Sequence, residues 1–119
     1  GADAVVLSNH GGRQLDGVAG TIDVLPAVVA AAAGRAEVFV DGGIRRGTDV
    51  VKALALGARG VFVGRPYLYG LAAGGRHGVA RALDILRAEL DKAMALVGAP
   101  TVDDIDASLV EVRVPQPAG

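Results

Sequence analysis

Cysteine is absent from the 119-residue sequence, and neither sign of charge predominates, because 12 residues are basic and 13 are acidic. Without cysteine, the protein can form neither a disulfide framework nor a thiolate metal site. A net charge of −1 gives no broad attraction to nucleic acid or to an anionic membrane. No apolar run approaches the roughly 20 residues that cross a bilayer. We therefore expect a cytoplasmic protein that binds no nucleic acid and has no membrane-spanning segment.

The first residues, GADAVVLSNHGG, lack an initiator methionine and also lack the basic region and cleavage pattern of a signal peptide. A strand-like apolar run begins almost at once, at Ala4. We therefore interpret the chain as one part of a larger protein.

The residues that are abundant are apolar side chains and glycine. Hydrophobic residues make up 51% of the chain, its mean hydropathy is +0.42, and 18 residues are glycine. Three short runs are almost continuously apolar, as expected of parallel strands buried on both faces: Ala4–Leu7, Val38–Val40 and Gly60–Val63. Glycines follow each run, which suggests that the backbone approaches a ligand at the strand ends.

Helical stretches alternate with these runs. The second helix has Thr48 as its expected N-cap, and the longest carries apolar residues at steps of three and four. His77 falls in a glycine-rich segment that we expect to be a solvated loop, and prolines predict an extended or mobile tail over Val112–Gly119. The expected helices are Ile22–Ala33, Asp49–Leu56, Tyr67–Ala72, Gly78–Val97 and Val102–Ala107.

The alternation of strands and helices predicts an α/β fold with right-handed βαβ units. Such units build either a doubly wound sheet or a (β/α)₈ barrel. Three strands cannot close a barrel, which takes eight. The chain must therefore dock with a missing part or leave sheet edges open.

The most informative motif, SNHGGRQLD, directly follows the first strand and begins at Ser8. His10 can act as a general base near neutral pH, and the planar guanidinium of Arg13 matches a carboxylate. Active sites of α/β barrels lie at the carboxyl ends of the strands, where this motif falls. Taken alone, His10 could be a hydrogen-bonded histidine at a strand end, and Arg13 could be a surface residue in an ion pair. The nine-residue motif at the end of a strand in a βα unit favours a catalytic role instead.

Two further loops have the composition of a phosphate site. The segment DGGIRRGTD follows the second strand and opens a helix, so glycine amides, the helix N-terminus and Arg45 could bind a phosphate. The third strand is followed by Gly64 and Arg65, and phosphate sites in barrels commonly use the last two such loops. We expect Arg46 to face solvent. The sequence contains neither the G-x-G-x-x-G motif of Rossmann folds nor a P-loop motif, so the two commonest nucleotide-binding folds lose their main support.

Together, SNHGGRQLD, DGGIRRGTD and GRPYLYGLAAGG resemble the FMN-dependent 2-hydroxy acid oxidases and dehydrogenases, the family of glycolate oxidase, lactate oxidase and mandelate dehydrogenase. The resemblance covers about residues 1–97. It implies that residues 1–119 are the C-terminal portion of one FMN-binding TIM-barrel domain, its last three βα units. By this resemblance His10 is the base, Arg13 binds the substrate carboxylate, and the FMN-binding residues are Ser8, Asp41, Gly42, Gly43, Ile44, Arg45, Gly64 and Arg65.

The implied reaction oxidises an L-2-hydroxy acid to a 2-oxo acid and reduces FMN. The resemblance leaves open a hydride or a carbanion route, and oxygen or another acceptor for the electrons. It also implies a missing N-terminal part of the barrel, a possible homotetramer, and an isolated chain without useful activity. The alternatives are another FMN barrel, such as an isomerase or an inosinate-dehydrogenase-like enzyme, and a non-catalytic half-barrel that binds a phosphate or a partner chain.

Overall fold

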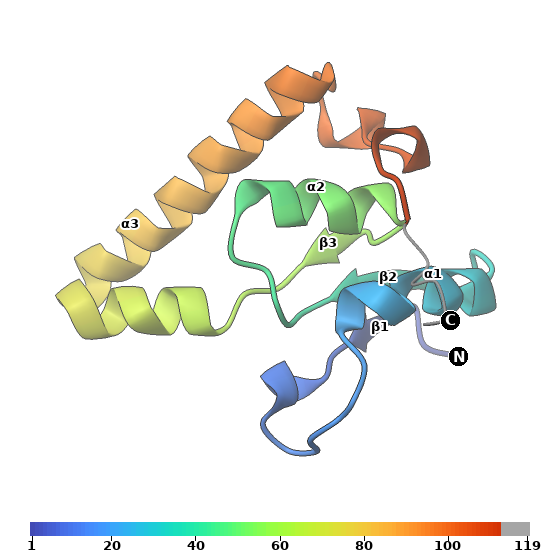
Figure 1. Ribbon diagram of the computed structural model, residues 1–119, viewed down its shortest axis with the longest axis horizontal. Coiled ribbons are helices and arrows are strands. Elements are labelled where there is room, and N and C mark those ends of the chain that lie inside the picture. The colour runs from blue at the N-terminus through green and yellow to red at the C-terminus, as the bar shows by residue number, and fades with distance from the viewer. Residues whose placement is uncertain (113–119) are drawn as a thin grey trace, which may run out of the picture.

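The computed structural model describes residues 1–112, so the tail prediction for 113–119 lies outside the described residues. A three-stranded parallel sheet has the order β1-β2-β3, as the sequence predicts. Two helices lie along the sheet, and a third leaves it as two limbs (Figure 1). The elements are β1 (Ala4–Leu7), α1 (Thr21–Ala32), β2 (Glu37–Val40), α2 (Gly47–Ala55), β3 (Gly60–Val61), α3 (Arg65–Val97) and three short 3₁₀ helices, η1 (His10–Gly12), η2 (Val102–Asp104) and η3 (Ala107–Leu109).

The core lies between the sheet and the helices α1 and α2. Val38 and Val40 of β2 are 4% and 1% exposed, and they pack against Leu25 of α1 and Ala53 of α2, both fully buried. Alternate residues of a strand point to opposite faces, so these valines define the helix-covered face. Ile44, just after β2, closes the same core.

The other face of the sheet carries apolar side chains without a covering helix. Phe39 and Phe62 contact one another there with ring centroids 5.7 Å apart, and Phe62 is 51% exposed. Val6, which pairs in register with Phe39, is 53% exposed. The expectation of strands buried on both faces is therefore wrong for this chain, because helices cover only the face that carries Val38 and Val40. The regular part of β3 is also shorter than expected.

The start of α2 differs from the sequence prediction. The helix begins at Gly47, two residues earlier than expected, and Thr48 lies inside it instead of capping it. The amides of Arg45 and Arg46 both donate to Oδ2 of Asp49 at 3.0 Å. Carboxylates are favoured in the first turn of a helix, where they meet unpaired amides and the positive end of the dipole.

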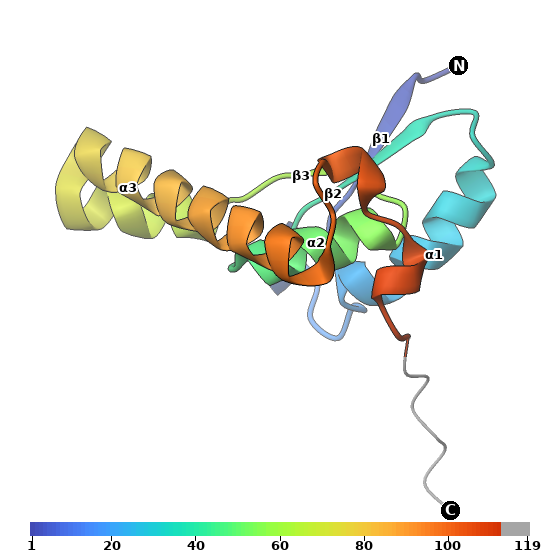
Figure 2. The ribbon, with the colours of Figure 1, turned by 90° about the horizontal axis from the view of Figure 1, so that it is seen from above.

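The two helices expected after β3 are present as the limbs of α3. The backbone departs from helical geometry at Gly74 and Gly75, where φ is −158° and +55°. His77 is exposed, but it lies in the second limb and not in a loop. The limbs approach closely at Gly70 and Gly78, whose backbones are in contact. Figure 2 shows both limbs projecting away from the sheet.

The end of α3 packs on the outer side of α2. Val51 and Ala55 of α2 meet Ala93 and Met94 of α3 in a second core, which Ile105 completes. Here the expected helix over 102–107 is instead two short 3₁₀ turns, η2 and η3. Among the helices that the structure describes, none is long and apolar enough to cross a membrane.

Contact between α2 and α3 requires glycine at position 47. A Cβ on Gly47 would overlap the backbone of Glu89 and Leu90, and neither helix can move without opening the second core. We predict that Gly47→Ala lowers the free energy of unfolding by about 1–3 kcal/mol or more. Urea denaturation of the protein measures this change.

The matched control is Gly74→Ala. Its Cβ would meet nothing within 4 Å, and its φ of −158° lies outside the left-handed region. Gly74→Ala should therefore lower the free energy of unfolding by less than Gly47→Ala does. Equal stabilities of the two variants would contradict this account of the α2–α3 contact.

Candidate active site

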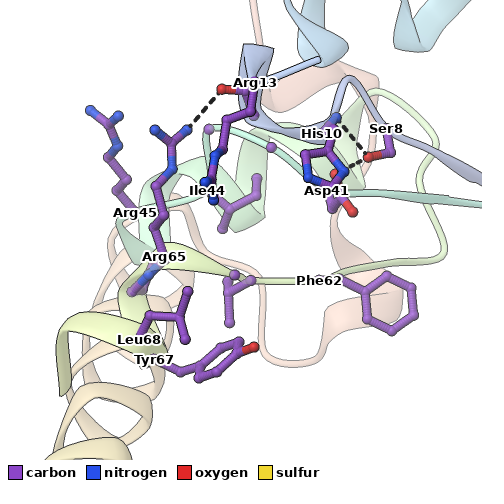
Figure 3. Close-up of a pocket in the computed structure, with 16 residues that line it drawn as sticks. Ser8, His10, Arg13, Asp41, Ile44, Arg45, Phe62, Arg65, Tyr67 and Leu68 are labelled. Carbon is purple, nitrogen blue, oxygen red and sulfur yellow. Dashed lines mark hydrogen bonds between the residues drawn. The ribbon is translucent and has the colours of Figure 1, made fainter. Parts of the chain in front are cut away.

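A cavity of about 310 Å³ lies beyond the carboxyl ends of the three strands (Figure 3). It is lined by the loops after β1 and β2 and by the start of α3. These segments come together because the strands are parallel, which brings their carboxyl ends to one edge. All ten predicted site residues line this cavity: Ser8, His10, Arg13, Asp41, Gly42, Gly43, Ile44, Arg45, Gly64 and Arg65.

The loop that carries His10 has an unusual backbone. Three successive residues, His10, Gly11 and Gly12, have φ of +53°, +64° and +72°. A left-handed conformation costs a non-glycine residue about 1–2 kcal/mol, so the surroundings must hold His10 in place. Asn9 helps to do so, because its Oδ1 accepts a hydrogen bond of 2.9 Å from the amide of Gly11.

Ser8 joins this loop to the loop after β2. Its hydroxyl donates to Oδ1 of Asp41 at 2.6 Å and accepts from the backbone amide of His10 at 3.1 Å. Figure 3 shows the three side chains grouped at one side of the cavity. The position of the His10 backbone is thus coupled to Asp41, which stands 33 residues away from Ser8 in the sequence.

The loop after β2 presents a run of unpaired amides. Gly42 and Gly43 have φ of +86° and +84°, and their amides and that of Ile44 donate to no protein group in residues 1–112. Consecutive amides in such a turn form an anion-binding concavity. Glycine is needed at position 42, because a Cβ there would be strained and would lie 2.8 Å from Oδ1 of Asn9.

The N-terminus of α2 does not extend this run, contrary to the sequence prediction. Asp49 already accepts the amides of Arg45 and Arg46, and Oε2 of Glu89 accepts the amide of Gly47 at 3.0 Å. These carboxylates already accept the backbone amides at the start of α2 that an anion would need as hydrogen-bond donors. The start of α3 is the helix terminus that borders the cavity, through Gly64, Arg65 and Pro66.

Two arginines give this part of the cavity its positive charge. Arg45 and Arg65 both line the cavity, and Nη2 of Arg65 donates to the carbonyl of Gly11 at 3.3 Å (Figure 3). Arg46 points elsewhere, with 74% of its side chain exposed and an ion pair of 3.6 Å to Glu89. The cavity therefore has a basic, amide-lined side and a side with His10, Ser8 and Asp41.

Sequence reasoning missed three residues that support the site: Asn9, Thr21 and Glu89. The hydroxyl of Thr21 is within hydrogen-bond distance of the carbonyls of Asp41 and Gly42, at 2.8 and 3.1 Å. Asn9 could have been found from its preference for helix caps and turns. Thr21 and Glu89 gave no local signal, because their partners are distant in sequence. Within residues 1–112, no cluster of three or more histidine, aspartate or glutamate side chains could hold a metal ion.

A parallel βα sheet with a basic, amide-lined cavity at its carboxyl edge defines an α/β protein suited to a phosphorylated ligand. The family model of the FMN-dependent dehydrogenases matches residues 1–112. The chain belongs to this family, whose members use FMN as their cofactor.

Named relatives agree with this assignment. The chain is 56% identical over 112 residues to an L-lactate oxidase of Nostoc, and 57% identical over 113 residues to a peroxisomal (S)-2-hydroxyacid oxidase of Arabidopsis thaliana. These matches cover 94% and 95% of the chain, and 31% of each relative. The chain also superposes on a soluble mutant of the membrane-associated (S)-mandelate dehydrogenase of Pseudomonas putida, with a TM-score of 0.86 and 48% identity, over 92% of this chain and 31% of that one.

The chain thus spans about a third of the length of the relatives that it matches. Those relatives include both oxidases and a dehydrogenase, and one of them is peroxisomal, so a cytoplasmic location stays a prediction. The family match and these relatives favour the 2-hydroxy acid enzymes over the FMN-dependent isomerases and inosinate-dehydrogenase-like enzymes.

Proposed function

We propose that this chain forms the last three βα units of a (β/α)₈ barrel that oxidises an L-2-hydroxy acid with FMN. The uncovered face of the sheet supports the barrel. Val6, Phe39 and Phe62 lie there exposed or half-buried, on the side that would face the centre of the barrel. The free edge of β1 is where a preceding strand would pair. Five more strands would cover the exposed face of the sheet and pair with the free edge of β1.

The residues of the cavity fit FMN. The amides of Gly42, Gly43 and Ile44, with the guanidinium groups of Arg45 and Arg65, would hold the phosphate. Ser8 and Asp41, on the other side, would contact the remainder of the cofactor. When bound, FMN supplies an acceptor for two electrons.

The chain's own residues then act on the substrate. The guanidinium of Arg13 would bind and orient the substrate carboxylate through paired hydrogen bonds. A ring nitrogen of His10 would accept the proton that leaves the substrate as it is oxidised. The left-handed backbone of His10, held by Ser8 and Asn9, would fix the direction of the imidazole.

One observation carries the proposal. His10 and Arg13 line the same cavity as the unpaired amides and Arg65, although these residues come from three separate loops. A non-catalytic phosphate-binding half-barrel would need the amides and arginines but not a base and a second anion-binding arginine. The arrangement therefore favours an enzyme.

The role of Arg65 can be tested in the full-length flavoenzyme. Arg65→Ala removes a charge-assisted phosphate contact worth about 1.5–3 kcal/mol, so FMN should bind roughly 10- to 150-fold more weakly. Titration of the apoenzyme by flavin fluorescence at low salt measures the affinity. The control, Arg59→Ala, removes an exposed arginine that is absent from the cavity lining and pairs with Glu37 at 3.4 Å. Equal affinities in the two variants would place Arg65 outside the phosphate site.

The roles of His10 and Arg13 separate in rapid-mixing experiments. His10→Asn removes the base and keeps a residue that tolerates the left-handed backbone. It should retain FMN and bind a 2-oxo acid, yet reduce flavin about 10²–10⁴-fold more slowly. Arg13→Lys loses the planar fork, so it should weaken substrate and product binding as well as slow the reaction. Flavin reduction by His10→Asn at the parent rate would show that His10 is not the base.

A further inference from the structure

A continuous series of hydrogen bonds connects helix α1 with the backbone of His10. The series begins at Thr21, the only buried polar side chain within the described residues, at 4% exposure. The Thr21 hydroxyl is shared between the carbonyls of Asp41 and Gly42, at 2.8 and 3.1 Å. The carboxylate of Asp41 accepts from Ser8, and the Ser8 hydroxyl accepts from the amide of His10.

Thr21 fixes two successive peptide groups of the turn after β2. The carbonyl and amide of a trans peptide point in opposite directions, and no peptide bond among the described residues is cis. When Thr21 holds the carbonyls of Asp41 and Gly42, it directs the amides of Gly42 and Gly43 away from α1. These two amides lead the unpaired run that borders the cavity.

This hydroxyl is not used to cap its own helix. Thr21 is the first residue of α1, the preceding N-cap is Gly20, and no side chain makes a capping hydrogen bond there. Both acceptors of the hydroxyl lie 20 or 21 residues further along the chain, in the loop after β2. Helix formation alone therefore gives no reason for a buried hydroxyl at this position.

We infer that Thr21 is a positioning residue, whose hydroxyl orients the glycine amides toward the flavin phosphate and, through Asp41 and Ser8, holds the backbone of His10. This inference rests on the proposed function. It adds to the site a residue, Thr21, that does not itself line the cavity. Thr21 contacts neither the base nor the anion-binding arginines in the hydrogen bonds that the structure describes. It acts through the turn.

The test compares Thr21→Val with Thr21→Ser in the full-length flavoenzyme. Valine has nearly the shape of threonine but no hydroxyl, whereas serine keeps the hydroxyl and loses a methyl group. Thr21→Val should bind FMN about tenfold more weakly, as expected when a buried hydrogen bond is lost. It should also reduce flavin several-fold more slowly at saturating substrate. Thr21→Ser should stay within about twofold of the parent in both measurements.

A matched control separates positioning from stability. Leu25→Val removes one methylene from a fully buried residue of the same helix, which should lower the unfolding free energy without changing the turn. Its FMN affinity and flavin-reduction rate should equal those of the parent. If Thr21→Val does not fold, Thr21→Ala removes the hydroxyl without a β-branch and takes its place.

Two results would overturn the inference. One is parent-like FMN affinity in Thr21→Val despite lower stability, which would leave Thr21 a purely structural role. The other is a Thr21→Ser variant as impaired as Thr21→Val, which would mean that the hydroxyl is not the cause. The parent enzyme tests the proposed function separately: failure of the parent to bind FMN, or to be reduced by any 2-hydroxy acid, would reject that proposal itself.

Discussion

The orientation of two peptide groups, after Asp41 and after Gly42, is the constraint on which the site depends. Their carbonyls are held from one side by Thr21, so their amides must face the other side. Glycine makes this possible, because the turn needs φ near +85° at positions 42 and 43. The same turn carries Asp41, which reaches Ser8 and thereby the His10 loop. One turn thus sets the proposed anion site and the position of the proposed base together.

Carboxylates determine where the proposed anion site ends. Up to Ile44 the amides of the turn are unpaired, whereas the next three amides are taken by Asp49 and Glu89. Glu89 lies 42 residues beyond Gly47, and it reaches that amide only because glycine lets α2 and α3 touch. A phosphate would therefore bind at the turn and the start of α3. It would be kept from the start of α2 by groups of its own charge.

Much of this arrangement could be predicted from the sequence. Short apolar runs predicted the three parallel strands, and the motifs after them, with the family resemblance, predicted ten of the residues that line the cavity. Local patterns succeed here because parallel strands bring their carboxyl ends together whatever the rest of the chain does. They failed where long-range contacts decide the outcome. Glu89 accepts the amide of Gly47 from 42 residues away, and Thr21 contacts the loop after β2, so neither residue gave a local signal. The Thr48 cap failed for a local reason, because the neighbouring Asp49 accepts the amides of Arg45 and Arg46. The strands were expected to be buried on both faces, but in residues 1–112 helices cover only one face of the sheet.

The most direct test of the central claim is a crystal structure of the full-length protein with FMN bound. The account predicts the phosphate oxygens within about 3 Å of the amides of Gly42, Gly43 and Ile44 and of the Arg65 guanidinium. It also predicts that the Thr21 hydroxyl still contacts the carbonyls of Asp41 and Gly42, with His10 facing the flavin. A phosphate bound at the N-terminus of α2, or a turn whose amides face away from the cofactor, would contradict it.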